Sequence, residues 1–242
     1  MKNVLIAAVI LGIAWYGKKV YDQTMYTIQD VTGQSSVQED RTLSTFTGIA
    51  SHIGADIEWR KGEVHSVQID APSDVMEKIR TRVEGDMLEI KAENDFSIGN
   101  QRIVIRITSP DLRRIHMMGS GDFVAKSAIR RSNFDANLGG SGSITVDDLE
   151  VENCDANLGG SGTISLSGKS TNTTLALGGS GTFEGKKLRS ERCEANLAGS
   201  GTIYCGVEDQ LEANLVGSGD IYYYGNPKVE ANKLGSGDVK KG

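Results

Sequence analysis

The stretch ANLGGSGSITV, residues 136–146, decides the fold of this chain because it returns in altered form throughout the C-terminal half. Its Gly-Ser-Gly corner occurs seven times, so that successive serines are separated by 21, 20, 19, 20, 18 and 18 residues. The serines are Ser120, Ser141, Ser161, Ser180, Ser200, Ser218 and Ser236. A fixed period near twenty residues is typical of proteins built from stacked repeats.

Residues on either side of the corner alternate between apolar and polar. Seven residues before the serine stand Phe134, Cys154 or Cys193, five before it alanine recurs, and three before it leucine recurs. After the corner, an apolar residue such as Ile144 or Ile164 stands three positions beyond every serine. A period of two on both sides of a glycine-rich turn predicts a strand, a turn and a second strand in each copy.

Each copy has only one thin apolar face, so a single copy cannot fold alone and neighbouring copies must stack. We therefore predict an all-β fold, a single-stranded parallel β-helix (β-solenoid) with about 20 residues per coil. Each strand would pair with its equivalent in the next coil, ~4.8 Å away. Crossover chirality favours right-handed winding. The alternative is an antiparallel up-and-down sheet whose hairpins turn at each Gly-Ser-Gly.

The repeated Asn-Leu-Gly-Gly-Ser-Gly phrase occurs together with RTLSTFTGI at 41–49 and SPDLRRI at 109–115. In these features residues 41–242 resemble the head GIN domain family, whose members are described as "putative auto-transporter adhesin". The resemblance implies a parallel β-helix-like fold on an exported bacterial protein, and it implies no established chemistry. The chain shows no translocator barrel, so the autotransporter part of that description is not expected to apply.

The composition fits recurring corners and argues against binding to nucleic acid. The chain has 30 glycines in 242 residues and only three prolines, a glycine share of about 12% against a usual ~7%. The formal net charge is −6, and no basic stripe with interleaved aromatic residues is present. We therefore expect no nucleic-acid partner.

Residues 1–21 are expected to be a signal peptide or an N-terminal membrane anchor. An apolar run of 13 residues from Val4 to Tyr16 lies between Lys2 and Lys18. That length is typical of a secretory signal and short of the about 20 residues that a membrane-spanning helix needs. The protein is therefore expected in the exported bacterial cell envelope, in the periplasm or on the cell surface, with this segment as its only membrane contact.

The rest of the chain divides into a tether and a solenoid domain. The polar residues 22–40 are predicted to form a tether. Residues 41–242 are predicted to form the solenoid, with irregular capping coils over 41–112 and the Gly-Ser-Gly repeats over 113–242. Within the cap, residues 73–83 could form one or two helical turns. A cap is expected because an uncovered terminal coil presents a bare strand edge that invites aggregation.

The cysteines and histidines indicate neither a metal nor a cofactor. Cys154 and Cys193 are predicted two coils apart, beyond the reach of a disulfide. Cys193 and Cys205 flank one corner and could bridge across the core, although small buried apolar residues are the simpler interpretation. The three histidines are scattered, and no spacing fits a zinc site.

Three sets of outward side chains are candidate binding residues. The first is an acidic row six residues before the serine, the second is an asparagine row four residues before it, and the third is a pair of tyrosines. They are Asp135, Asp155, Glu194 and Glu212; Asn137, Asn157, Asn196 and Asn214; and Tyr204 and Tyr222.

Each set has a structural and a functional interpretation. Stacked carboxylates repel, so we expect nearby lysines to relieve the acidic row; a calcium site is less favoured because the aspartate of the calcium-binding nonapeptide is missing. The asparagine amides can hydrogen-bond along the stack or bind a sugar. Outward tyrosines can stack on a sugar ring, anchor a protein partner, or only stabilise the sheet.

No catalytic residue is predicted, because the acidic positions obey the repeat whereas a catalytic residue is expected to interrupt it. The preferred hypothesis is a noncatalytic exported cell-envelope protein that displays repetitive polar faces for adhesion, or for binding a polysaccharide or an envelope protein. The alternative is a carbohydrate-active enzyme, a polysaccharide lyase or hydrolase, that uses the acidic row.

Overall fold

The computed structural model describes residues 26–29, 35–93 and 101–242, so the predicted signal or anchor at 1–21 lies outside the described residues. The strands all join one sheet that coils upon itself. They are β1 (Tyr26–Gln29), β2 (Ser35–Arg41), β3 (Gly48–Ser51), β4 (Asp56–Lys61), β5 (Ser66–Pro72), β6 (Ile79–Glu84), β7 (Met87–Ala92), β8 (Val104–Ser109), β9 (Arg114–Met117), β10 (Asp122–Ala125), β11 (Ile129–Leu138), β12 (Ser143–Gly160), β13 (Thr163–Gly179), β14 (Thr182–Gly199), β15 (Thr202–Gly217), β16 (Asp220–Tyr224), β17 (Lys228–Gly235) and β18 (Val239–Lys241). One short helix, α1 (Ser73–Met76), lies among them.

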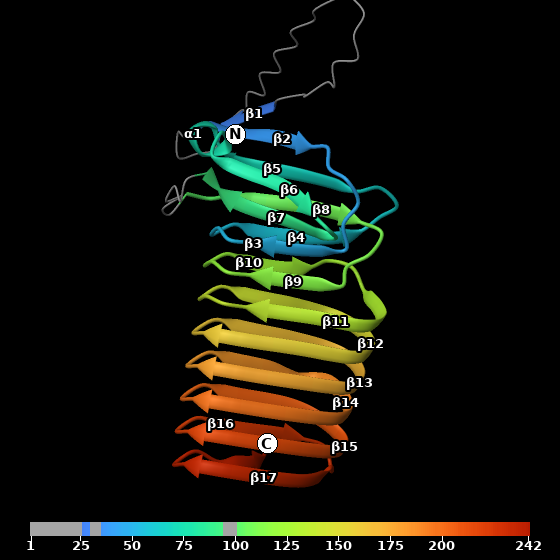
Figure 1. Ribbon diagram of the computed structural model, residues 1–242, viewed down its shortest axis with the longest axis vertical. Helices are drawn as coiled ribbons and strands as arrows, with labels where there is room; N and C mark the ends of the chain where they lie inside the picture. The colour runs from blue at the N-terminus through green and yellow to red at the C-terminus, as the bar shows by residue number, and fades with distance from the viewer. Residues whose placement is uncertain (1–25, 30–34, 94–100) are drawn as a thin grey trace, which may run out of the picture.

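The repeats stack as a parallel β-solenoid, with the coils ordered along the long axis in chain order from β9 to β18 (Figure 1). Ile144 pairs with Ile164, which pairs with Phe183 on the next coil, so residues at the same offset from the serine lie over one another. Every pairing among these strands is parallel. The predicted solenoid is therefore confirmed, and the antiparallel hairpin alternative is wrong.

The inward side chains form a buried apolar core that runs along the solenoid. The leucine column, which lies three residues before each serine, is at most 2% exposed from Leu138 to Leu215. Phe123 and Phe183 are fully buried at the apolar position after the corner. Burying one such side chain contributes about 1.5–3 kcal/mol, so the columns supply the main stabilisation of the stack.

The last coil departs from the repeat. Lys233 occupies the position that is leucine in the coils before it. Ala231, which pairs with the buried Ala213 of the coil before, is exposed. The Lys233 ammonium donates to Asp238 Oδ1 at 3.0 Å instead of entering the core. No later coil of the described chain covers this surface, and charged side chains are a usual means of protecting such an edge from association.

The cap over 41–112 mixes solenoid rungs with antiparallel strands. Strands β3 and β4 pair in parallel with β9 and β10 and so form the rung above the repeats. Strands β7 and β8 form a further parallel rung on the other side of β3 and β4, although they follow these strands in the chain. Strand β5 then pairs antiparallel to β8, and β6 antiparallel to β7. The cap thus covers the upper end of the core.

Two local predictions within the N-terminal part need correction. The described residues of the predicted tether, 22–40, form strands β1 and β2, and β2 pairs antiparallel to β5 along its whole length. The predicted helical stretch 73–83 is helical only over α1 and then becomes strand β6, where Ile79 is buried. Strand β2 pairs with the sequence-distant β5, and β6 forms a hairpin with the adjacent β7. In both cases strand pairing overrides a weak local preference.

Candidate binding face

The outward side chains of the coils from β11 to β17 form a face with three parallel columns, which we call the ladder face. Its central acidic column carries one carboxylate per coil except in β13, and an amide column runs along each side of it. The acidic column is Asp135, Asp155, Thr174, Glu194, Glu212 and Glu230; the predicted amide column is Asn137, Asn157, Ala176, Asn196, Asn214 and Asn232; and the second amide column is Asn133, Asn153, Asn172, Arg192, Gln210 and Lys228.

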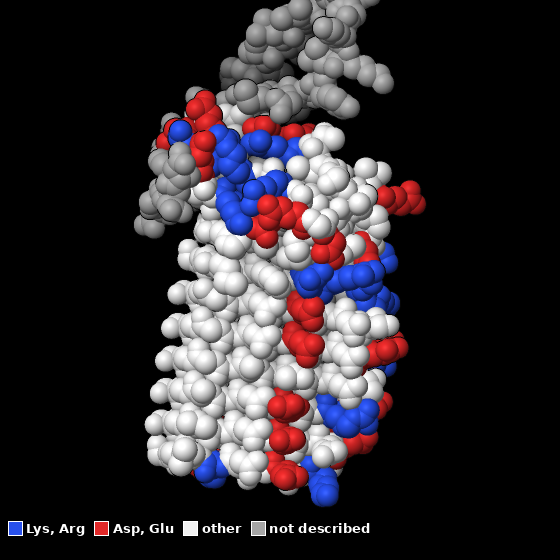
Figure 2. All heavy atoms as spheres, viewed as in Figure 1, with Lys and Arg blue, Asp and Glu red and all other residues white. Residues whose placement is uncertain are grey.

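Figure 2 shows the acidic column as a line of carboxylates running down the coils, with an uncharged surface along one side of it. This uncharged strip extends over the coils from β11 to β15 and contains the predicted amide column and the glycine-rich corners. The ladder face therefore combines one line of charge with a broad neutral surface rich in hydrogen-bonding groups.

Amide hydrogen bonds connect successive coils along both amide columns. Asn157 Nδ2 donates to Asn137 Oδ1 at 2.9 Å, and Asn214 donates to Asn196 at the same distance. In the second column Asn172 donates to Asn153 at 2.9 Å, and Arg192 Nε donates to Asn172 Oδ1 at 2.9 Å. The predicted structural role of the asparagine row is thus visible in the structure. Sequence analysis missed the second column, which asparagine at the same offset in three copies could have indicated.

Amides, and not lysines, contact two carboxylates of the acidic column. Asn196 Nδ2 donates to Glu194 Oε1 at 2.9 Å, and Asn214 Nδ2 contacts Glu212 Oε1 at 3.4 Å. None of the ion pairs between described residues includes a carboxylate of this column. The expected relief by lysines is therefore not found in the part of the chain that the structure describes.

The upper end of the acidic column is electrostatically strained. Burial, together with the neighbouring Asp155 carboxylate, raises the pKa of Asp135 above its ordinary value, and the nearby Arg114 guanidinium only partly opposes this shift. Arg114 is itself held by Asp86 of the cap at 2.5 Å. The ionised form of Asp135 thus costs folding free energy.

Asp135→Asn is expected to raise the melting temperature at pH 7. A carboxyl with a raised pKa in the folded state binds its proton more tightly there than in the unfolded chain, so stability falls as the pH rises through that pKa. The gain from the substitution should therefore disappear below the ordinary value of 3.8, where the carboxyl is protonated in both states. Thermal unfolding between pH 3 and pH 8 measures this difference. Glu230→Gln in the exposed last coil is the control, and a gain that persists at pH 3 would show that charge is not the cause.

The β13 coil interrupts the ladder face. Here Thr174 replaces the acidic residue and Ala176 replaces the asparagine. Two hollows of about 240 Å³ and about 490 Å³ adjoin this coil, the first lined by residues that include Thr174, the second by residues that include Ala176. The absence of two long side chains from one coil thus coincides with two depressions of the face.

The tyrosine pair lies elsewhere on the solenoid, on β15 and β16. The Tyr204 and Tyr222 rings stack with centroids 5.1 Å apart and an interplanar angle of 17°. The Lys240 ammonium lies 5.0 Å from the centroid of the Tyr222 ring, in register on the next strand. Tyr223, between Tyr222 and Tyr224, packs against the core. Because both faces of Tyr222 are occupied by neighbours, a sugar ring would reach its edge more readily than its face.

The three cysteines are buried and unbridged. Burial and nearby carboxylates raise the pKa of Cys154 to about 12. A side-chain hydrogen bond with Cys205 is the main cause that raises the pKa of Cys193, and burial is the second. Among the described residues, no group of three or more histidine, cysteine and acidic side chains is placed to hold a metal ion. Nor does any helix within those ranges have the length and apolar character needed to cross a membrane.

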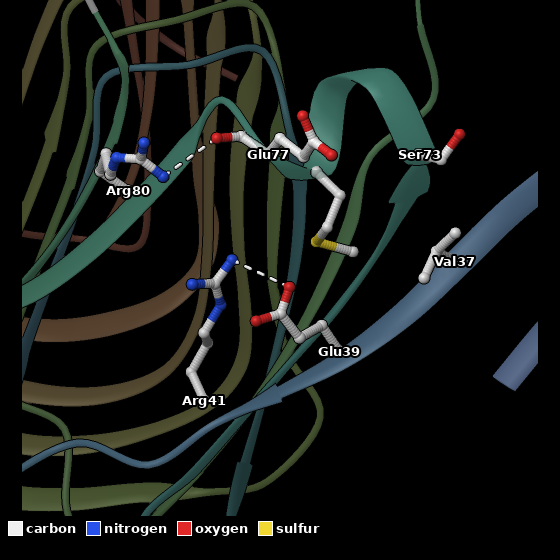
Figure 3. Close-up of a pocket in the computed structure, with 7 residues that line it drawn as sticks. Val37, Glu39, Arg41, Ser73, Glu77 and Arg80 are labelled. Carbon is white, nitrogen blue, oxygen red and sulfur yellow. Dashed lines mark hydrogen bonds and ion pairs between the residues drawn. The ribbon is translucent and has the colours of Figure 1, made fainter. Parts of the chain in front are cut away.

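The cap contains a separate cavity of about 360 Å³ between β2, α1 and β6. Figure 3 shows Arg41 and Arg80 on one side of it, Glu39 and Glu77 nearer its middle, and Val37 on the opposite side. Arg41 Nη2 donates to Glu39 at 3.1 Å, and Arg80 donates to the Glu77 carbonyl oxygen at 3.0 Å and to Glu93 at 2.7 Å. Arg41 Nε is buried and has no hydrogen-bond partner among the described residues. The ladder face, in contrast, repeats its donors and acceptors over the coils from β11 to β17, and we develop it as the candidate site.

These features define the chain as a β-solenoid repeat protein. The family described as "Putative auto-transporter adhesin, head GIN domain" matches residues 45–227, and the chain belongs to this family. The resemblance inferred from the repeated corner is thus confirmed. A comparison with curated proteins gave no match.

Solved structures of bacterial proteins share the fold. A putative adhesin from Bacteroides fragilis has 25% sequence identity and a TM-score of 0.81, and the alignment covers 85% of this chain and 96% of that one. A putative lipid binding protein from Parabacteroides distasonis has 24% identity and a TM-score of 0.70, with 86% and 96% covered. A putative adhesin from Parabacteroides merdae has 18% identity and a TM-score of 0.66, again with 86% and 96% covered. The latter two likenesses concern the fold alone.

Proposed function

We propose that this chain is a noncatalytic, exported cell-envelope protein that binds polysaccharide on its ladder face. The observation that carries the proposal is a set of hydrogen-bonding side chains repeated at one rung spacing, ~4.8 Å, over the coils from β11 to β17. Side-chain amides both donate and accept hydrogen bonds, whereas carboxylates accept them. Such a face suits a polymer that presents hydroxyl groups at regular intervals.

Family membership and sequence support the remaining parts of the proposal. Adhesion to surface polymers agrees with the description of the family and with the Bacteroides fragilis relative. Export agrees with the apolar segment from Val4 to Tyr16. A noncatalytic role agrees with the regularity of the acidic column, because its carboxylates follow the repeat whereas a catalytic residue is expected to interrupt it.

A binding experiment tests the proposal. The full chain is applied to immobilised neutral polysaccharides (dextran, mannan, xylan) and to polygalacturonate, and we expect it to be retained by at least one of them. Replacing Asn196 and Asn214 together by alanine should weaken that binding about tenfold or more, since each lost hydrogen bond costs about 0.5–1.5 kcal/mol and 1.4 kcal/mol corresponds to tenfold. Lys187→Ala, on β14 but outside the ladder face, should leave binding unchanged.

Two outcomes would contradict the proposal. One is retention by none of the polysaccharides. The other is the appearance of new reducing or unsaturated ends that is lost in Asp155→Asn, because that result would identify the acidic column as the catalytic group of an enzyme.

A further inference from the structure

The interruption of the ladder face at β13 is confined to its surface. The coil keeps parallel register with β12 and β14 on both sides of Thr174 and Ala176. Its inward neighbours Leu175 and Leu177 are buried, at 1% and 2% exposure. The fold therefore does not require the two short residues, and either column could continue through this coil.

Each of the two short residues lines one of two neighbouring hollows. The hollow of about 240 Å³ crosses β13, β14 and β15, and its polar lining includes Asn172, Thr174, Arg192, Glu194, Gln210 and Glu212. The hollow of about 490 Å³ crosses β12 to β15, with the small residues Gly159, Ala176, Gly178 and Ala198 on its floor.

A ridge separates the two hollows on the lower coils and ends at β13. On β14 the ridge is the hydrogen-bonded pair Glu194 and Asn196, and on β15 it is Glu212 and Asn214. On β13 the corresponding side chains are a hydroxyl-bearing threonine and a methyl group, which are too short to meet. Thr174 and Ala176 therefore leave a gap in the ridge, and we call this gap the notch.

We propose that the notch is where the ladder face holds one sugar ring of an uncharged polysaccharide, an inference that rests on the proposed function. Arg192 and Gln210 offer donors, and Glu194 and Glu212 offer acceptors, to the hydroxyl groups of such a ring. The polar hollow of about 240 Å³ is smaller than the ~300–1,000 Å³ of pockets for drug-sized ligands, which suits a single ring. The larger hollow gives the apolar C–H surface of the next ring a floor of small residues.

The charge of the notch favours a neutral sugar over an acidic one. Two carboxylates and one guanidinium line the polar hollow, and Arg192 Nε is already bonded to Asn172. The acidic column continues above and below it in Asp155 and Glu230. A uronic acid polymer lying along the face would place its own carboxylates beside this column, and like charges at such spacing repel.

Restoring the repeat provides the test. Ala176→Asn should complete the amide column between Asn157 and Asn196, so the melting temperature should be unchanged or higher. The added side chain should also close the notch and weaken binding of the full chain to a neutral polysaccharide at least tenfold. Arg192→Gln keeps an amide next to Asn172 but removes the guanidinium, and it should weaken binding several-fold. Lys187→Ala, on β14 but outside both the ladder face and the two hollows, should bind within twofold of the parent chain.

The outcomes separate this inference from the function on which it rests. Parental affinity in both Ala176→Asn and Arg192→Gln overturns the notch and leaves polysaccharide binding on the ladder face standing. Binding to polygalacturonate but to no neutral polysaccharide likewise overturns only the notch. Binding to no polysaccharide overturns both.

Discussion

Gly179→Ala is expected to destabilise the solenoid by about 3 kcal/mol or more. Gly179 has a φ of +131°, where an L-residue is strained, and a β-carbon there would lie 2.5 Å from the carbonyl oxygen of Gly160 on the coil above. That oxygen accepts hydrogen bonds from the backbone N–H groups of Ser180 and Gly181, at 3.1 and 3.0 Å, and cannot withdraw without loosening the corner. Backbone strain of about 1–3 kcal/mol and overpacking of about 1–3 kcal/mol add here. Urea unfolding followed by circular dichroism measures the loss.

The adjacent Gly178→Ala is the matched control. Gly178 has no positive φ, and a β-carbon there meets nothing within 4 Å. Its substitution should be neutral or stabilise by about 0.4–1 kcal/mol, because alanine restricts the unfolded chain. If the two substitutions had equal effects, the close approach of successive corners would not be the reason why position 179 requires glycine.

Phe183→Ala is expected to cost about 3–5 kcal/mol. Phe183 is fully buried and lies between Ile164 and Ile203 of the neighbouring coils. Truncation removes most of the side chain from the buried apolar core and leaves a cavity there. The free energy of unfolding from urea titration measures this cost.

Phe183→Ile is the control for the column. It places at this coil the residue that occupies the same position above and below, so the cost should fall to about 1–2 kcal/mol. A loss as large as that of alanine would indicate that the aromatic ring, rather than the filling of the column, stabilises this coil.

The repeat made the solenoid predictable because identical residues at identical offsets favour in-register stacking over the antiparallel alternative. Leu158, Leu177 and Leu197 come into contact only if each coil stacks in register on the one before. The same reasoning placed the acidic and asparagine columns correctly on the outside. It predicted hydrogen bonds along the asparagine column but not those to the acidic column, because an asparagine such as Asn196 can also donate across to Glu194, and rotamers decide between these partners.

The candidate site was predictable only in part. The sequence indicated the columns by their regularity, but the notch consists of the two positions, Thr174 and Ala176, where regularity fails. In a single sequence, such a departure from the repeat does not indicate a binding site, since threonine and alanine are also ordinary strand and surface residues. Only the coordinates bring Arg192 and Gln210 from the next two coils to the same hollow.

The sequence by itself determined the coil length, the inward columns and the parallel register, since all three follow from short-range alternation repeated at a nearly constant period. The tertiary structure alone decided the cap, where β7 and β8 stack beyond β3 and β4 against chain order and β2 joins β5. The cap strands do not belong to the sequence repeat, so the repeat does not predict their pairing, and long-range packing determines which strands lie side by side. The same holds for the exposure of Ala231, which depends on the absence of a covering coil and not on its own sequence neighbours.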